Sequence, residues 1–483
     1  MLPLPFRSAK QLASEIRRKR VGCLELLDLY LARVARYNPR LNAIIATDVA
    51  GARKRARAAD RALARGQMWG PLHGVPMTIK ESYDVAGTPT TWGVPELKDN
   101  YPARNALAVD RFLAAGAVLF GKTNVPLYLA DWQSYNAIYG TTNNPWDGRR
   151  TPGGSSGGSA AVLATGLTGL EAGSDIGASI RNPAHYCGVF GHKPTFGIAP
   201  PRGQALPGKV AQGDISVIGP MGRSADDLEL ALGIMAGPDE IESAGWQLRL
   251  RAPKKTLREY RVAVMLTDPC SEVDREVQDR LQALADFLGR KRVKVSDRAR
   301  PDVDTAEAHR VYIYLLRAAT SGRQTAADFE RNLEIARTLA PGDESYFARM
   351  ARANTMSHRD WLTFDEARHQ MRWKWAEFFR EWDLLLCPPA ASAAFPHDHE
   401  GERHERTIAV NGKRVPTTDQ LFWAGYSCAF YLPSTVAPCG FTPSGLPVGV
   451  QIVAPQYGDR SSIHFARLLE REFQPFVPPP GYE

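Results

Sequence analysis

The sequence predicts an α/β protein, a single large domain in which a mixed, mostly parallel β-sheet core is covered by helices. Strand-like and helix-like patterns alternate after residue 66 in the order strand, helix, strand, which is the order of a βαβ unit. The 483 residues contain no Pro/Ser-rich linker at which separate domains would divide. A hydrophobic fraction of 44% with 23% charged residues is enough to bury one large core.

The domain is expected to span residues 1–483 in consecutive segments. N-terminal helices should occupy about residues 8–65, and the core should begin with about residues 66–240. A charged, helix-rich insertion is expected at about 270–380, where it would shape the entrance to a site. A segment that closes the core should follow at about 381–473.

The N-terminal segment carries an amphipathic helical pattern. Leucines recur at helical spacing from Leu24 to Leu31, Pro39 interrupts the pattern, and the pattern resumes over 43–64. Two or three helices are therefore predicted here.

The pattern then changes to a period of two. From Gly70 to Lys80, apolar residues alternate with small or polar ones, which predicts a strand with Lys80 at its end. A helix over 107–115 and a short apolar strand over 117–120 should follow. The later elements predicted in the same way are helices at 222–235, 274–288, 365–382 and 461–473, and strands at 261–267, 383–387 and 445–454.

Charge and cysteine content limit the class of protein. The net charge of +8 comes from the first 70 residues, where 15 basic residues face 5 acidic ones on helical patterns. Solvated helix faces account for such runs, and neither a nucleic-acid partner nor a membrane is expected. The six cysteines are scattered without metal spacing, which indicates free thiols in a reducing compartment. No signal peptide or long apolar run is seen, so we expect a cytoplasmic protein.

Residues 151–181 form the most unusual stretch, TPGGSSGGSAAVLATGLTGLEAGSDIGASIR. A Gly/Ser run alone is typical of a flexible linker. Here a small-residue apolar segment over 160–170 follows at once, and a second Gly/Ser turn closes the stretch. Glycine allows sharp turns that aim backbone amides at a ligand. We therefore predict two functional turns that are joined by a core helix.

This stretch and several further motifs resemble the amidase signature family of serine hydrolases. The further motifs are GVPMTIK (Gly74–Lys80), GAVLFGKTNVP (Gly116–Pro126), NNPWD (Asn143–Asp147) and GLPVGVQIVAP (Gly445–Pro455). The resemblance implies an α/β/α fold and the hydrolysis of a small-molecule amide to a carboxylate and an amine or ammonia. It implies no metal or organic cofactor, and it admits a homodimer.

The resemblance also implies roles for three residues. Ser179 would be the nucleophile that forms an acyl-enzyme, Ser155 the bridging serine on a cis peptide bond, and Lys80 the base. The family usually has two glycines before the nucleophile, whereas this chain has Gly177 and Ala178. A second hypothesis within the family is the catalytic subunit of a glutamine-dependent tRNA amidotransferase, which needs partner subunits.

The residue types suit this chemistry. A serine hydroxyl needs a base to attack an amide, and a lysine at its usual pKa near 10.4 is protonated. Burial away from water would lower the pKa of Lys80 and allow it to act as that base. An oxyanion could bind to the backbone amides of Ile176, Gly177, Ala178 and Ser179. Structural support is assigned to Ser156 and to an ion pair between Asp175 and Arg181.

Three other motifs compete with this interpretation. GAVLFGKT (Gly116–Thr123) matches the P-loop pattern, but its middle residues resemble a strand rather than a phosphate-wrapping loop. GGSSG (Gly153–Gly157) matches the α/β-hydrolase nucleophile elbow, but the polar, proline-broken segment before it cannot be a core strand. PHDHEGERH (Pro396–His404) could suggest a metal site, but a solvated loop is the simpler interpretation.

The substrate pocket is predicted from aromatic residues. Leu129, Trp132 and Tyr135 lie in a stretch that contributes to the acyl-binding channel of related amidases. With the aromatic segment 422–431, they favour an uncharged, hydrophobic acyl or aryl group. The sequence does not specify which amide, carbamate or urea is the natural substrate.

Overall fold

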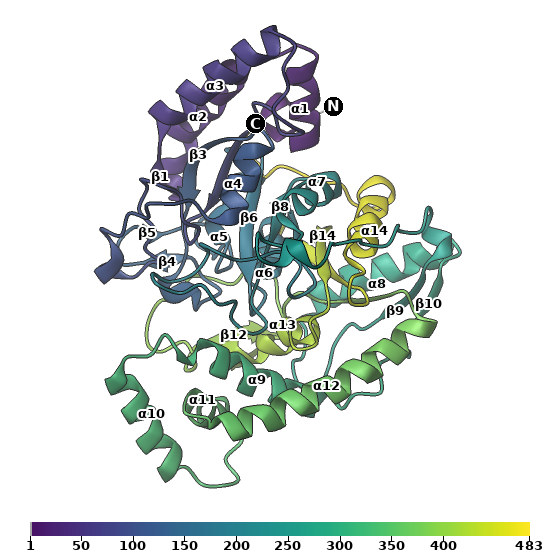
Figure 1. The fold of residues 1–483 in the computed structure, drawn as a ribbon. Helices are drawn as coiled ribbons and strands as arrows, with labels where there is room; N and C mark the ends of the chain where they lie inside the picture. Colours follow the sequence, from purple (N-terminus) through teal and green to yellow (C-terminus); the bar gives the residue numbers. More distant parts are fainter. Residues whose placement is uncertain (1) are drawn as a thin grey trace.

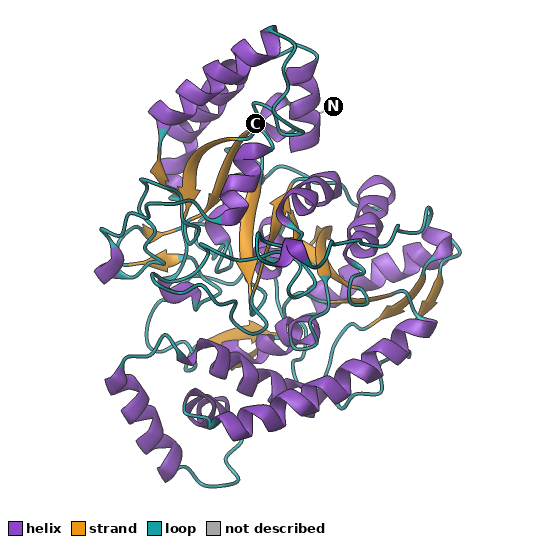
Figure 2. Ribbon diagram, viewed as in Figure 1, coloured by secondary structure: helices purple, strands orange, loops and turns teal. Residues whose placement is uncertain are grey.

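The computed structural model describes residues 2–483, and two β-sheets organise them (Figures 1 and 2). The large sheet has eight strands in the order β10-β9-β11-β15-β14-β7-β8-β6, and the small sheet has three in the order β1-β3-β2. Strand β2 of the small sheet packs beside β6, the edge strand of the large sheet. This junction brings together strand ends from both sheets.

The N-terminal helices cover the small sheet. They are α1 (Ala9–Arg17), α2 (Cys23–Leu41) and α3 (Val49–Ala64), with β1 (Ile44–Thr47) between the last two. The predicted interruption at Pro39 is wrong, because α2 continues through it for its last turn and Asn42 N–H donates to Asn38 O at 2.7 Å. The predicted helix over 43–64 is also wrong at its start, which forms β1 against β3.

The predicted βαβ unit is confirmed. Strand β2 (Pro76–Lys80) and strand β3 (Val118–Thr123) pair in parallel, and α4 (Leu107–Ala114) connects them. Lys80 is the last residue of its strand, and all five residues of that strand are buried.

The large sheet is mixed, as predicted, but it is mostly antiparallel. Only the pairings of β9 with β10 and with β11 are parallel, whereas its other five pairings are antiparallel. The hairpin of β14 and β15 shows the reason: a tight turn connects them, and such a turn can only join antiparallel strands. The strands are β6 (Glu171–Asp175), β7 (Phe190–Lys193), β8 (Val217–Gly222), β9 (Arg261–Val264), β10 (Lys294–Ser296), β11 (Leu384–Cys387), β14 (Ser434–Phe441) and β15 (Pro447–Val453).

Helix α5 (Gly157–Ala164) lies between the two sheets, where it contacts β2 and β3 on one side and β6 and β8 on the other. All eight of its residues are buried. A Cβ on Gly158 would lie 2.5 Å from the Asn124 backbone nitrogen, so only glycine allows the helix to approach the segment that follows β3 this closely. The small residues of this helix therefore let the two sheets share one core.

The remaining helices cover the large sheet and extend below it in Figure 1. Helices α6 (Arg181–Cys187), α7 (Ala225–Met235), α8 (Arg275–Arg290) and α14 (Asp459–Glu472) pack against its strands. Helix α9 (Thr305–Ser321) packs against α11 (Tyr346–Asn354), α12 (His358–Glu381) and α13 (Leu421–Cys428), and α10 (Ala326–Thr338) packs on α11. Two short hairpins complete the fold: β4 (Tyr135–Asn136) with β5 (Gly140–Thr141), and β12 (Thr407–Val410) with β13 (Lys413–Pro416).

Two further properties of residues 2–483 concern membrane-spanning helices and cysteines. None of their helices is long and apolar enough to cross a membrane. Five of the six cysteines are buried, Cys270 is partly exposed, and all six are free thiols.

The packing of β8 generates a stability prediction. A Cβ at Gly219 would lie 2.2 Å from the His192 carbonyl oxygen on the neighbouring strand. Gly219→Ala should therefore lower the free energy of unfolding by about 1–3 kcal/mol or more. The control is Gly233→Ala, on the exposed face of α7. No atom lies within 4 Å of the Cβ that this substitution adds. Because alanine has a higher helix propensity than glycine, the control should raise the free energy of unfolding by about 0.5–1 kcal/mol. Urea denaturation of both variants would test this, and equal effects would contradict it.

Candidate active site

The two Gly/Ser turns lie side by side at the junction of the sheets. Ser155 lies in the turn that precedes α5, and Ser179 lies in the turn between β6 and α6. The Ser156 amide donates to the Ser179 carbonyl oxygen at 3.1 Å, which ties one turn to the other. The Ser156 hydroxyl is buried and has no hydrogen-bond partner within residues 2–483. The Gly154–Ser155 peptide bond is cis.

Lys80 enters this junction from the end of β2. Its Nζ lies 2.6 Å from Ser155 Oγ and 3.0 Å from Ser174 Oγ, and the side chain is fully buried. The pKa of Lys80 is lowered to about 7, chiefly by burial; Asp175 opposes this shift, and Arg323 adds to it. A large fraction of Lys80 is therefore neutral at pH 7 and able to accept a proton.

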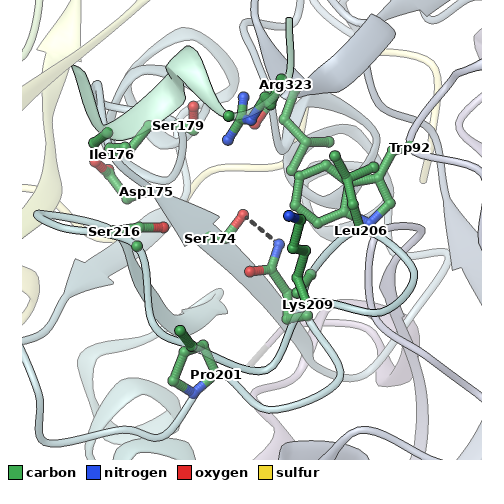
Figure 3. A pocket seen from close by; sticks show the side chains of 18 of the residues that line it. Trp92, Ser174, Asp175, Ile176, Ser179, Pro201, Leu206, Lys209, Ser216 and Arg323 are labelled. Carbon is green, nitrogen blue, oxygen red and sulfur yellow. Dashed lines mark hydrogen bonds between the residues drawn. The ribbon is translucent and has the colours of Figure 1, made fainter. Parts of the chain in front are cut away.

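Ser174 and Gln204 complete this network, and the sequence analysis missed both. Gln204 Nε2 donates to Ser174 Oγ at 3.1 Å and to Ser82 Oγ at 3.0 Å, and Figure 3 shows the bond to Ser174. Ser174 lies within the 151–181 stretch, next to Asp175, but no feature of the sequence selects this serine inside a strand, and Gln204 lies in a loop. The packing of β6 beside β2 brings Ser174 to Lys80, and the loop between β7 and β8 brings Gln204 to Ser174.

Asp175 determines the shape of the Ser179 turn. Its carboxylate accepts hydrogen bonds from the amides of Ala178 at 2.9 Å and Ile180 at 3.0 Å. It also forms the predicted ion pair with Arg181, at 2.9 Å, with both side chains fully buried. Burial by itself would raise the pKa of Asp175, but Arg181 and the amide donors lower it to about 2. The carboxylate is therefore ionised at neutral pH.

This contact corrects one predicted role. The amide of Ala178 points at Asp175 and is not available to an oxyanion. Ala178 also has φ +67°, a left-handed conformation that costs an alanine roughly 1–2 kcal/mol and that glycine adopts freely. Ala178 thus stands at a position where the backbone conformation favours glycine, the residue that the family usually has there.

Two side chains hold the carbonyl groups of the same turn. The Tyr312 hydroxyl on α9 donates to Ile176 O at 3.0 Å, and Trp132 Nε1 donates to Gly177 O at 2.7 Å. Because C=O and N–H of a trans peptide point in opposite directions, the Gly177 amide points away from Tyr312. Tyr312 is a further residue that the sequence analysis missed.

Ser179 lies where two cavities meet. The first cavity, of about 260 Å³, is lined by Ser155, Ser174 and Gln204 and by the loop that carries Leu206 and Lys209 (Figure 3). The second cavity, of about 410 Å³, extends between Trp132 and the α9–α10 region. Ile176, Ser179, Leu129 and Arg323 line both cavities.

Two of the three predicted pocket residues line a cavity, and the third does not. Leu129 lines both cavities and Trp132 lines the second, but Tyr135 lines neither of them. Tyr135 instead stacks on His399 and accepts a hydrogen bond from Arg406. In the aromatic segment 422–431, Phe422 and Tyr426 are buried, and Tyr426 packs edge-to-face on Trp375. That segment therefore belongs to the core and gives no support for a hydrophobic substrate.

The competing motifs do not form the sites that they suggest. Gly121, Lys122 and Thr123 belong to strand β3, and Lys122 Nζ donates to Pro89 O and Thr90 Oγ1. The residues that enter Ser155 are not a strand, which excludes a nucleophile elbow. Two histidines follow that elbow motif: His185 is bonded to Ser392 and Gly449, and His192 to Thr435 and Asp459. Over residues 2–483, no group of three or more His, Cys, Asp or Glu residues is placed to hold a metal ion.

Comparison with known proteins identifies the family and the fold. The Amidase family model matches residues 25–462. The indoleacetamide hydrolase of Bradyrhizobium diazoefficiens is 31% identical over 470 residues, which cover 96% of this chain and 86% of the relative. One of the subunits of the glutamyl-tRNA(Gln) amidotransferase of Methylobacillus flagellatus is 30% identical, with 96% of both chains covered. The crystal structure of a bacterial aryl acylamidase of the amidase signature family has the same fold, with a TM-score of 0.82 and 23% identity over 98% of this chain and 97% of that one.

The fold and these matches define an enzyme that hydrolyses the carbon–nitrogen bond of amides. The chain belongs to the amidase signature family, as its motifs predicted.

The buried ion pair generates a prediction. Asp175→Asn keeps the shape of the side chain but leaves the Arg181 guanidinium buried without an opposite charge. The free energy of unfolding should fall by about 3–5 kcal/mol, as measured by denaturant titration. The control is Glu240→Gln, which removes the exposed pair with Arg202 and should cause no measurable change. A loss in Asp175→Asn as small as the control's would contradict this account.

Proposed function

We propose that the protein hydrolyses a carboxylic amide through an acyl-enzyme on Ser179, with Lys80 as the base and Ser155 as the bridge between them. The contact between Lys80 Nζ and Ser155 Oγ, 2.6 Å in a fully buried setting, carries this proposal. The lowered pKa of Lys80, about 7, supplies the neutral amine that the reaction needs.

Acylation begins with two coupled proton transfers. Ser155 gives its hydroxyl proton to Lys80 Nζ and takes the proton of Ser179, while Ser179 Oγ attacks the carbonyl carbon of the amide. The tetrahedral intermediate then collapses. The proton returns from Lys80 through Ser155 to the leaving nitrogen, and the carbon–nitrogen bond breaks.

The amides of Ile176, Gly177 and Ser179 are the donors proposed for the oxyanion. Their support comes from the tethers on the same turn: Tyr312 holds Ile176 O, and Asp175 takes the Ala178 amide. Such preorganised donors stabilise the developing negative charge more than water does.

Deacylation repeats the relay with water. Water takes the place of the amine, gives its proton through Ser155 to Lys80, and attacks the ester carbonyl carbon. The ester bond to Ser179 Oγ breaks, and Ser179 regains a proton from Lys80 through Ser155, which returns Lys80 to its neutral form. The product leaves as a carboxylic acid, which gives its remaining proton to water and becomes a carboxylate, and the cycle is complete.

A second candidate is the catalytic subunit of a glutamine-dependent amidotransferase, because a protein of that kind is 30% identical over nearly the whole chain. The two candidates differ in their need for a partner. Hydrolysis of simple amides by the purified chain supports the first candidate. Glutamine hydrolysis that appears only when a partner protein is added supports the second.

The nucleophile can be identified by covalent labelling. Phenylmethylsulfonyl fluoride or a fluorophosphonate should modify Ser179, which lies at the meeting point of both cavities. Peptide mapping by mass spectrometry locates the adduct, and Ser179→Ala should prevent both labelling and turnover. An adduct on Ser155 would assign the nucleophile to the other turn.

The base can be identified from a pH profile. Because Lys80 must be neutral, kcat/KM should rise about tenfold per pH unit below pH 7 and level off above it, near the pKa of about 7. Lys80→Met should lower kcat/KM roughly 10³–10⁶-fold. Lys80→Arg should be almost as damaging, because a guanidinium stays charged and cannot accept the proton.

A matched control comes from the other buried lysine of the same sheet. Lys122→Met removes an amine whose pKa burial also lowers, but Lys122 Nζ bonds to Pro89 and Thr90 rather than to a serine of the site. The folded Lys122→Met variant should keep the rise of kcat/KM with pH below pH 7. Substantial activity in Lys80→Arg, or an unchanged pH limb in Lys80→Met, would mean that the base is another group.

A further inference from the structure

The second cavity is rich in arginine. Four arginines line it: Arg317 and Arg323 from the end of α9 and the turn after it, Arg331 from α10, and Arg403 from the loop before β12. Arg323 also lines the first cavity, and in Figure 3 its guanidinium extends to the Ser179 side of that cavity.

Only Arg331 among these four has a carboxylate partner within residues 2–483, Asp328 at 2.7 Å. Arg323 Nη1 donates to the Tyr128 carbonyl at 2.8 Å, and Arg403 Nη1 donates to the Ala130 carbonyl at 2.8 Å. Carbonyl oxygens satisfy single donors but do not neutralise a charge. Within the described chain, Arg317 Nε and Arg403 Nε and Nη2 are buried without any partner.

The acidic residues of the same cavity do not balance this charge. Asp131 is bonded to Arg406 at 2.7 Å, and Asp328 is occupied by Arg331. Glu402 is exposed at the surface. Three cations thus face one solvated carboxylate.

Burial and mutual repulsion lower the pKa of these guanidinium groups. Burial lowers the pKa of Arg323 to about 10, and burial with Arg403 and Arg323 nearby lowers the pKa of Arg317 to about 9. Both values stay well above 7, so the groups remain charged. Arg317, Arg323 and Arg403 are only partly exposed, so their unpaired charges are incompletely solvated, and a bound anion would offset that cost.

The proton relay decides which part of the substrate enters this cavity. Ser155 must return a proton to the leaving nitrogen, and Ser155 lines the first cavity but not the second. The leaving amine or ammonia therefore occupies the first cavity. The acyl group on Ser179 then extends into the second cavity, toward the arginines.

We infer that the substrate is an amide whose acyl group carries a carboxylate, held by Arg323 together with Arg317 and Arg403. This inference rests on the proposed function and narrows its substrate class. It opposes the hydrophobic acyl group expected from the aromatic residues of the sequence. Arginine suits the task because its planar fork binds a carboxylate through two parallel hydrogen bonds.

A substrate panel of matched length tests the inference. Malonamate, succinamate and glutaramate are compared with propionamide, butyramide and valeramide, and 4-aminobutanamide supplies the opposite charge. Ammonia release gives kcat/KM for each. The best anionic amide should exceed its uncharged counterpart about 10–100-fold, as expected for charged hydrogen bonds, and the cationic amide should be the poorest.

Variants then locate the preference. Arg323→Met and Arg403→Met should each lower the ratio of anionic to uncharged kcat/KM about tenfold or more, whereas Arg323→Lys should keep part of it. Arg331→Gln is the matched control, because this arginine lines the same cavity but is already paired with Asp328. It should leave the ratio within about twofold. Circular dichroism and thermal unfolding would verify that each variant is folded.

Binding separates this inference from the proposed function. Succinamate and butyramide are titrated calorimetrically into Ser179→Ala, which needs no turnover. Tighter binding of succinamate, weakened by Arg323→Met in that background, supports the inference. Equal binding, an equal or greater kcat/KM for uncharged amides, or an Arg331→Gln effect as large as that of Arg323→Met would overturn it. Full activity in Ser179→Ala would instead overturn the assigned nucleophile.

Discussion

The buried pair of Asp175 and Arg181 is the interaction on which the site depends. Asp175 ends β6 and binds two amides of the Ser179 turn, so the carboxylate shapes the backbone that would receive the oxyanion. Arg181 extends the same network to the Ala424 carbonyl, the Ser427 hydroxyl and Gln451 on β15. A turn of small residues has little packing of its own. Its conformation is therefore maintained by a charge pair that is anchored on a helix and on the large sheet.

The same burial that makes this pair strong gives Lys80 its chemistry. The Lys80 and Asp175 side chains are buried at the junction of β2 and β6, where a charge is stable only with a partner. Asp175 has one in Arg181, whereas the near neighbours of Lys80 Nζ are the hydroxyls of Ser155 and Ser174. One desolvated region thus keeps a carboxylate ionised and an amine neutral, two protonation states that the proposed reaction needs together.

The features that could be predicted from the sequence are those that depend on local patterns. Lys80 at a strand end and the two Gly/Ser turns follow from short patterns and from a family resemblance, as does the parallel unit of β2, α4 and β3. The direction of the large-sheet pairings was predicted wrongly, because a strand pattern does not identify its partner. Ser174 was missed, although it lies in the 151–181 stretch, because it reaches Lys80 only when β6 packs beside β2. Tyr312 was missed because its neighbours in sequence carry no signal. The unpaired state of Arg323 depends on where distant carboxylates lie, which only the folded chain determines.

Helix α9 contributes to the site at two points. Tyr312 holds the Ile176 carbonyl of the Ser179 turn, and Arg317 lies five residues further along the same helix, before the turn that carries Arg323. A mutation that tilts or shifts α9 therefore displaces both the Ser179 turn and the arginines that line the second cavity. Arg403 lies on a separate loop that can change without moving the turn. During divergence within the family, new substrate charges would be accommodated more readily through that loop than through α9.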